Sequence, residues 1–187
     1  MHARVDALRP GDMNAEQREL YDRVLSGPRA NVPRPFPLTD DEGRLRGPFN
    51  AMLFSPKLGN ALQELGAAVR FQTEFTARQR EIAILVVAAH ERSEFEWKAH
   101  SHIGREAGLT EDDLDGIRTG AASSFEDPVE DAVLTVTREF VATGDLTDDR
   151  FAEAVRVLGL TRLYELVTLV GYYRMLADQL RVLRVTD

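Results

Sequence analysis

The sequence predicts an all-α protein, folded as a bundle of about six to eight helices. Two observations support this fold class. Residues that cap helix N-termini recur along the chain, and each is followed by apolar residues at helical spacing. Glycines stand where these segments end, and no segment alternates apolar and polar residues as a half-buried strand does.

The composition is typical of a globular protein. The 187 residues fit one domain with an N-terminal extension, and 43% of them are hydrophobic and 29% charged. The 23 basic and 31 acidic side chains give a formal net charge of -8. Because this negative balance repels phosphate backbones, we expect no nucleic-acid partner.

The chain contains no cysteine, which excludes disulfides, thiolate metal sites and thiol-based peroxidase chemistry. Residues 1–21 hold no apolar segment of the length found in signal peptides. The longest apolar run, residues 82–89, is too short to cross a bilayer. We therefore expect a cytoplasmic protein without a membrane partner.

An N-terminal extension is predicted over residues 1–46. Asn14 and Gln17 form a pair of capping residues that opens a helix ending near Gly27. Residues 28–47 are rich in proline and predict a loop, which is long enough to be functional or to wrap a neighbouring subunit.

The main helical domain is predicted over residues 47–187. Its first helix starts at Ser55-Pro56 and runs to about Phe71. Capping residues open further helices at Thr76, Ser93, Thr110, Asp127 and Thr147. Glycines end most of them, at Gly108, Gly120, Gly144 and Gly159. The last helix covers about residues 161–183 and is very apolar.

The helix opened by Thr76 is apolar all round over residues 82–89, which predicts burial at the centre of the bundle. Residues 93–107, placed on a helix, separate into three faces. The apolar face holds Phe95, Ala99, Ile103 and Ala107. Beside it lies a polar stripe of Ser93, Glu96 and His100, with Trp97 just beyond. The solvated side holds Glu94, Lys98, Ser101 and Arg105.

Three of these side chains predict an acid–base site. Glu96 and His100 are one turn apart, so the carboxylate can orient the imidazole and raise its basicity. Glu81 starts the buried apolar helix, where partial desolvation favours the protonated form that a general acid needs. The two helices are joined by a tight turn around Arg92. We therefore expect Glu81, Glu96 and His100 to lie within about one water of one another.

Structural roles remain open for the same residues. Ser93 with Glu96 also fits a capping box, and Glu81 also fits a first-turn carboxylate favoured by the helix dipole. His100 also fits a hydrogen-bonded interface histidine, and Trp97 a packing residue. The spacing of Glu81, Glu96 and His100 matches neither the di-iron nor the zinc-protease patterns, so we expect no metal and no cofactor, although these ligand types are compatible with zinc.

The residues from Glu81 to His100, EIAILVVAAHERSEFEWKAH, resemble the carboxymuconolactone decarboxylase domain. Residues 108–110 and the upstream segment 47–56, GPFNAMLFSP, extend the resemblance, which covers about residues 47–120. The family pattern has a glutamate, then Cys-x-x-Cys, then a histidine. Their positions here are Glu81, Ser93, Glu96 and His100.

The resemblance implies an AhpD-like helical bundle that assembles as a trimer or hexamer. With Ser93 and Glu96 at the two cysteine positions, the peroxidase reaction of AhpD-like relatives cannot run. The Glu-x-Trp-x-x-His form is similar to the decarboxylase side of the family, which acts on a lactone bearing a carboxylate.

We therefore expect a decarboxylase-like lyase that acts on a small carboxylated or lactone substrate, with Glu81, Glu96 and His100 as its acid–base residues. Substrate binding is assigned to Ser93, Trp97 and an arginine, either Arg80 or its alternatives Arg70 and Arg78. Two other interpretations stay open. One is a diverged antioxidant relative, alkylhydroperoxidase- or peroxiredoxin-like, without thiol chemistry. The other is a non-enzymatic oligomeric protein that binds a small molecule.

Overall fold

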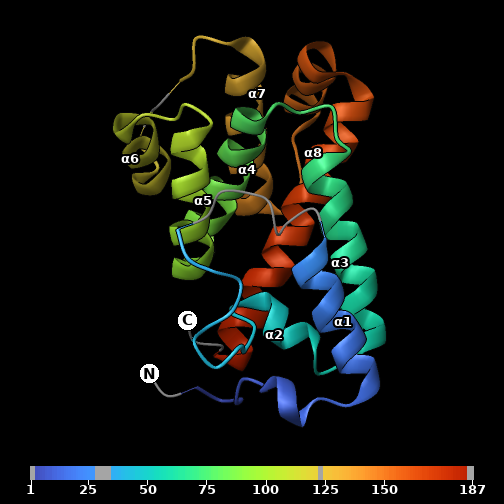
Figure 1. The fold of residues 1–187 in the computed structure, drawn as a ribbon. Coiled ribbons are helices and arrows are strands. Elements are labelled where there is room, and N and C mark those ends of the chain that lie inside the picture. Colours follow the sequence, from blue (N-terminus) through green and yellow to red (C-terminus); the bar gives the residue numbers. More distant parts are fainter. Residues whose placement is uncertain (1–2, 28–34, 122–123, 185–187) are drawn as a thin grey trace. The chain divides into compact units, whose positions relative to one another are not determined.

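The protein is all-α, as the sequence predicts. The computed structural model describes residues 3–27, 35–121 and 124–184, and this part of the chain forms eight α-helices and no strand (Figure 1). The described residues also include a 3-10 turn, Pro10–Asp12, and an isolated bridge between Thr39 and Leu45. Part of the predicted proline-rich loop, residues 28–34, lies outside the described residues.

The chain divides into two compact units. One comprises Met1–Phe71 with Leu176–Asp187, and the other comprises Gln72–Met175. This division differs from the boundary between residues 46 and 47 that marks the N-terminal extension in the sequence, and that boundary stays a prediction. Glu81, Glu96 and His100 all belong to the second unit.

The first unit contains three helices besides the end of the last one. Helix α1 (Ala15–Ser26) begins at the predicted capping box, in which the Asn14 and Gln17 side chains each bond to the other's backbone. Helix α2 is Pro48–Met52, and helix α3 is Pro56–Phe71, the range predicted from the sequence.

The second unit is built around α4 (Ala77–His90), which starts at the predicted Thr76 and Gln79 capping box. Its apolar residues from Ile82 to Ala88 are at most 4% exposed, so the predicted central burial is confirmed. Helices α5 (Glu94–Glu106), α6 (Glu111–Thr119) and α7 (Pro128–Thr143) all pack against α4.

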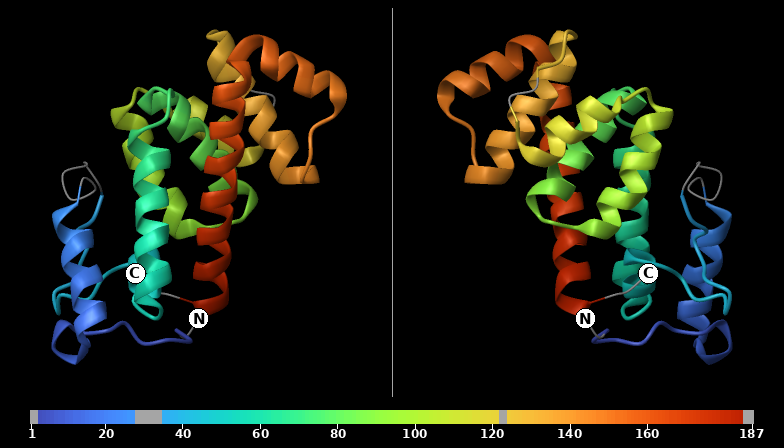
Figure 2. Two further views of the ribbon diagram at one scale, coloured as in Figure 1. Left: turned by 90° about the vertical axis from the view of Figure 1, so that its right-hand side faces the viewer. Right: turned by 90° about the vertical axis from the view of Figure 1, so that its left-hand side faces the viewer.

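Helix α8 (Asp148–Leu183) is interrupted at Gly159, whose φ of 76° and ψ of 165° are not helical. Figure 2 shows the two helical segments of α8 running in different directions on either side of this break. The predicted end of a helix at Gly159 is therefore confirmed. In the described part of the chain no helix is both long enough and apolar enough to span a membrane.

The predicted capping box at Ser93 and Glu96 is wrong. Ser93 is the N-cap of α5, but its side chain forms no capping bond. The Glu96 side chain is only 4% exposed and pairs with His100 instead of turning back to the helix end. A buried partner inside the protein thus outweighs a solvent-exposed bond at the helix terminus.

The buried face of α5 also differs from the prediction. The buried residues are Glu96, His100, Ser101 and Gly104, whereas Phe95 and Ile103 are only half-buried. Ser101 was expected in solvent. The helix is rotated toward its polar stripe because α4 presents a buried carboxylate, Glu81, that needs a partner.

Gly104 permits the close approach of α5 to α4. A Cβ atom at this position would lie 2.8 Å from Leu109 Cδ1 and 3.3 Å from Leu85 Cδ1 of α4. Gly104→Val therefore overpacks this contact, and we expect it to lower the free energy of unfolding by about 1–3 kcal/mol in urea denaturation. Gly171→Val is the control, because nothing lies within 4 Å of a Cβ there. Equal stabilities of the two variants would contradict the tight contact.

Candidate active site

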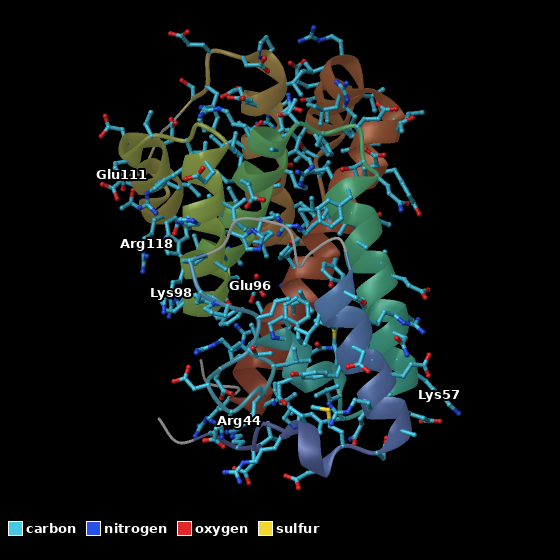
Figure 3. All side chains as sticks on the ribbon, in the orientation of Figure 1. Arg44, Lys57, Glu96, Lys98, Glu111 and Arg118 are labelled. Carbon is cyan, nitrogen blue, oxygen red and sulfur yellow. The ribbon has the colours of Figure 1, made fainter. Side chains whose placement is uncertain are left out.

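Glu81, Glu96 and His100 form one buried group, which we term the acid–base cluster. His100 Nδ1 lies 2.6 Å from Glu81 Oε2, and His100 Nε2 lies 3.4 Å from Glu96 Oε2. The predicted convergence of the three side chains is therefore confirmed. In Figure 3 Glu96 points to the opposite side of α5 from Lys98.

The hairpin of α4 and α5 places these side chains. Ser93 N bonds to Ala88 O, and Arg92 adopts a φ of 54°, so the chain reverses within a few residues. Glu81 lies near the start of α4 and His100 in the middle of α5. The tight turn therefore brings the two to similar heights on facing helices.

Burial makes the pairing necessary. Glu81 is 0% exposed, Glu96 4% and His100 5%. A buried carboxylate is costly unless a positive charge or hydrogen bonds compensate it. His100 lies between the two carboxylates and is their shared partner.

The imidazole of His100 is a cation at neutral pH. Burial lowers the pKa of His100, but the charge of Glu81, the Tyr173 hydroxyl and the hydrogen bonds with Glu81 and Glu96 together outweigh burial and raise it from 6.5 to about 10. The basicity expected from the sequence is thus present, with Glu81 as a stronger contributor than Glu96. Both ring N–H groups then face carboxylates, Nδ1 toward Glu81 and Nε2 toward Glu96.

Tyr173 of α8 packs against the acid–base cluster and was not singled out from the sequence. Its ring is perpendicular to the His100 ring, with 5.1 Å between the centroids. The ring of Tyr172 packs edge-to-face against the ring of Tyr173, with 5.4 Å between the centroids. Tyr173 is 2% exposed. The sequence pattern does not distinguish Tyr173 from the other apolar residues of the last helix, and no local signal links Tyr173 to His100.

Two polar atoms beside His100 have no hydrogen-bond partner among the described residues. They are Glu96 Oε1 and the Tyr173 hydroxyl oxygen, and both are buried. Leaving a buried polar group unpaired costs about 1–3 kcal/mol. Such groups in a native protein are expected to have a use, and here they offer one acceptor and one donor to a small molecule.

Ser93 and Trp97, predicted to bind substrate, are both half-buried on α5. The Arg118 guanidinium lies 4.8 Å from the centroid of the Trp97 ring and also pairs with Glu94 at 3.0 Å. This contact supports the packing role considered for Trp97. A role of Ser93 or Trp97 in substrate binding stays a prediction.

The three arginines considered for a substrate carboxylate have different surroundings. Arg78 forms ion pairs with Glu130 at 3.0 Å and Asp113 at 3.2 Å, so it ties helices together. Arg70 belongs to the other compact unit. Arg80 is half-buried in the first turn of α4, directly before Glu81, and donates to a backbone carbonyl at 3.3 Å. Among the described residues no group of three metal-ligating side chains is arranged to hold an ion.

The protein is an all-α bundle in which a hairpin of two helices carries a buried glutamate and a buried histidine. Residues 56–139 match the model of the carboxymuconolactone decarboxylase family. Over these residues, slightly less than half of the chain, the protein is similar to that family. The matched residues include the whole acid–base cluster but not Tyr173.

Solved structures agree on the fold. One is the debrominase Bmp8, in a cysteine-to-alanine form with bound 2,3,4-tribromopyrrole, which is 14% identical in sequence and has a TM-score of 0.74. The match covers 100% of this chain and 92% of the Bmp8 chain. An uncharacterized peroxidase-related protein with an alkylhydroperoxidase AhpD core from Ralstonia eutropha JMP134 is 15% identical with a TM-score of 0.72, covering 100% and 95%.

A protein of unknown function and putative antioxidant defence protein AhpD from Agrobacterium tumefaciens is 19% identical with a TM-score of 0.63. The match covers 74% of this chain and 95% of that protein. Identities this low show the fold alone, and the predicted AhpD-like bundle is thereby confirmed. A comparison with curated protein sequences gives no match.

The pairing of His100 predicts a pH dependence of stability. The pKa of His100 is raised on folding, so its contribution is complete below about 6.5 and is lost as the pH rises through about 10. We expect the free energy of unfolding, measured by urea denaturation, to fall across this interval in the wild type. His100→Gln removes this part of the slope, and the exposed His90→Gln keeps it. Parallel pH profiles for the wild type and His100→Gln would contradict the buried pair.

Proposed function

We propose that the protein is an acid–base enzyme, a decarboxylase-like lyase that acts on a small carboxylated or lactone substrate. One observation carries the proposal: a buried, protonated imidazole is held between two carboxylates, and one of these has an oxygen without a partner. Such an arrangement stores a proton and can pass it on in either direction. Thiol chemistry is excluded because the chain has no cysteine.

Each residue of the cluster has a distinct role in this proposal. Glu81, at 2.6 Å from Nδ1, orients the imidazole and keeps it charged. His100 is the proton reservoir. Glu96 faces His100 with Oε2 and keeps Oε1 available, so Glu96 exchanges the proton with the substrate.

The reaction balances with these groups alone. In a decarboxylation the bond between carbon and the carboxylate breaks, CO2 leaves, and the electron pair moves into a conjugated carbonyl of the substrate. The carbon then takes a proton that Glu96 has received from His100 Nε2. Glu96 is a carboxylate again after this transfer, and a proton from solvent restores the imidazolium of His100.

The cluster itself does not attract an anionic substrate. With both carboxylates ionised it carries two negative charges and one positive charge, so a substrate carboxylate needs a separate cation. We assign that role to Arg80, which directly precedes Glu81. Ser93 and Trp97 complete the proposed binding residues.

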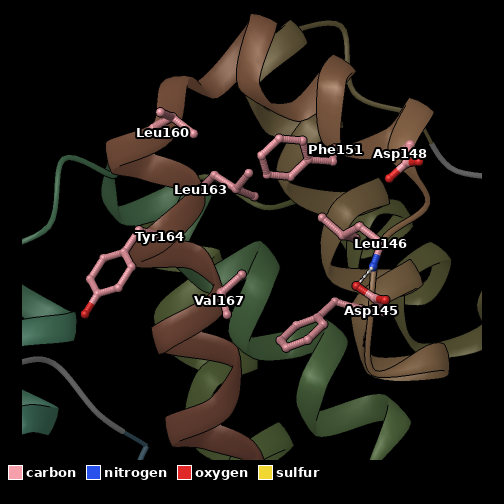
Figure 4. Close-up of a pocket in the computed structure, with 9 residues that line it drawn as sticks. Asp145, Leu146, Asp148, Phe151, Leu160, Leu163, Tyr164 and Val167 are labelled. Atoms are coloured by element: carbon pink, nitrogen blue, oxygen red, sulfur yellow. Dashed lines mark hydrogen bonds between the residues drawn. The ribbon is translucent and has the colours of Figure 1, made fainter.

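We also propose a cytoplasmic homo-oligomer, a trimer or hexamer. Four apolar side chains of the second unit are exposed by 38–75%, namely Phe151, Leu160, Tyr164 and Val167. They line a hollow of about 500 Å³ between the two segments of α8 and the loop before it (Figure 4). Apolar side chains clustered in this way are typical of a surface that another subunit covers.

Glu96→Gln tests the acid–base role. The amide cannot exchange the proton, so we expect conversion of carboxymuconolactone, followed by its ultraviolet absorbance, to fall about 10²–10⁴-fold. Glu94→Gln makes the same change on the same helix at an exposed position and should keep the activity. Full activity of Glu96→Gln would exclude Glu96 as the exchanging group.

The exposed apolar side chains of α8 lead to a testable prediction about the oligomeric state. Leu160→Glu combined with Tyr164→Glu should shift the protein from a trimer or hexamer to smaller species in sedimentation velocity, because charges replace apolar side chains in the interface. Lys57→Glu, a charge change at another exposed position, should leave the assembly unchanged. A wild type that sediments as a monomer would overturn the proposed assembly.

A further inference from the structure

The Tyr173 hydroxyl is a buried donor without an acceptor. The side chain is 2% exposed, and none of the described residues forms a hydrogen bond with its oxygen. Buried tyrosines usually find a partner for the hydroxyl, since leaving it unpaired costs about 1–3 kcal/mol. The ring alone would serve packing against His100, and a phenylalanine would do so without this cost.

Within the acid–base cluster no other group can donate a hydrogen bond to a ligand. Glu81 and Glu96 are acceptors when ionised. Both ring nitrogens of His100 already face carboxylates, at 2.6 Å and 3.4 Å. A carbonyl oxygen brought to this cluster would meet only negative oxygens and the hydroxyl of Tyr173.

We propose that Tyr173 is the hydrogen-bond donor of the site and that its hydroxyl binds the carbonyl oxygen of the substrate. This inference rests on the proposed acid–base function. The inference adds a catalytic residue from α8 to a cluster otherwise formed by α4 and α5. Tyr173 lies outside the segment that matches the family model.

The proposed step is complete with these groups. The carboxylate of Glu96 takes a proton from the carbon next to the conjugated lactone system, and the electron pair of the broken C–H bond moves onto the carbonyl oxygen. The O–H of Tyr173 donates to that developing enolate oxygen and stabilises it. Return of a proton from Glu96 to carbon restores the lactone. In a decarboxylation the same oxygen receives the electron pair of the C–C bond that breaks.

Hydrogen–deuterium exchange of a probe lactone isolates this step. The protein is incubated in D2O with an unsaturated five-membered lactone that carries no carboxylate, and loss of the ring proton signal is followed by NMR. We expect exchange with the wild type and a rate about 10²–10³-fold lower with Tyr173→Phe, the usual effect of removing one oxyanion donor. The loss should appear in the rate at saturating lactone more than in the apparent affinity.

Stability provides a readout independent of the reaction. Tyr173→Phe keeps the ring against His100 and removes only the unpaired hydroxyl, so its unfolding midpoint should equal or exceed that of the wild type. Tyr21→Phe is the matched control, because the Tyr21 hydroxyl donates to Gly43 O at 2.8 Å; this variant should lower the unfolding midpoint and leave exchange unchanged.

The outcomes separate the two proposals. Exchange that is lost in Glu96→Gln but unchanged in Tyr173→Phe would overturn the role of Tyr173 and leave the acid–base function standing. No exchange with the wild type would overturn both. A clearly lower unfolding midpoint of Tyr173→Phe would show that the hydroxyl is used inside the protein, which also overturns the inference.

Discussion

The buried carboxylate of Glu81 is the constraint on which the second unit depends. It lies on a helix that is otherwise apolar, and it is fully shielded from solvent. A carboxylate at such a place is tolerated only next to a compensating cation. His100 provides that cation, and its pKa of about 10 is the consequence. The orientation of α5 follows from this pair, because the helix must turn its polar stripe inward for His100 to reach Glu81.

The second carboxylate, Glu96, changes what the pair can do. With Glu81 as its only partner, His100 would form an ion pair in which no group is left to exchange a proton. Glu96 approaches the other ring nitrogen at 3.4 Å and leaves one of its own oxygens without a partner. In the proposed function this free oxygen lets Glu96 pass a proton between His100 and the substrate. The resemblance described above aligns Glu96 with a cysteine position of the family pattern, and the proposed function gives this position a role in proton transfer.

Close packing between helices holds this cluster in place. Gly104 lets α5 approach Leu85 of α4, and the turn at Arg92 fixes the heights of the two helices. Tyr173 closes the cluster from α8 with its ring against His100. Its hydroxyl and Glu96 Oε1 are the polar atoms left over when the internal pairing is complete. A site built in this way has little freedom to rearrange, which is the condition for electrostatic stabilisation of a reacting molecule.

The sequence by itself determined the helices and the closeness of Glu81 to His100. Caps such as Thr76 with Gln79 are local signals, since the bonding groups are three residues apart. A short turn between two helices likewise determines which residues lie at the same height, so counting residues outward from the turn predicts which of them face each other. The tertiary structure decided how Glu96 is used, which face of α5 is buried, and that Tyr173 joins the site. The buried face of α5 and the contact of Tyr173 depend on partners far along the chain, and the use of Glu96 depends on whether its side chain is buried. A capping bond at Ser93 and a buried pair with His100 use the same Glu96 side chain, and only the surrounding helices set which of them is more stable.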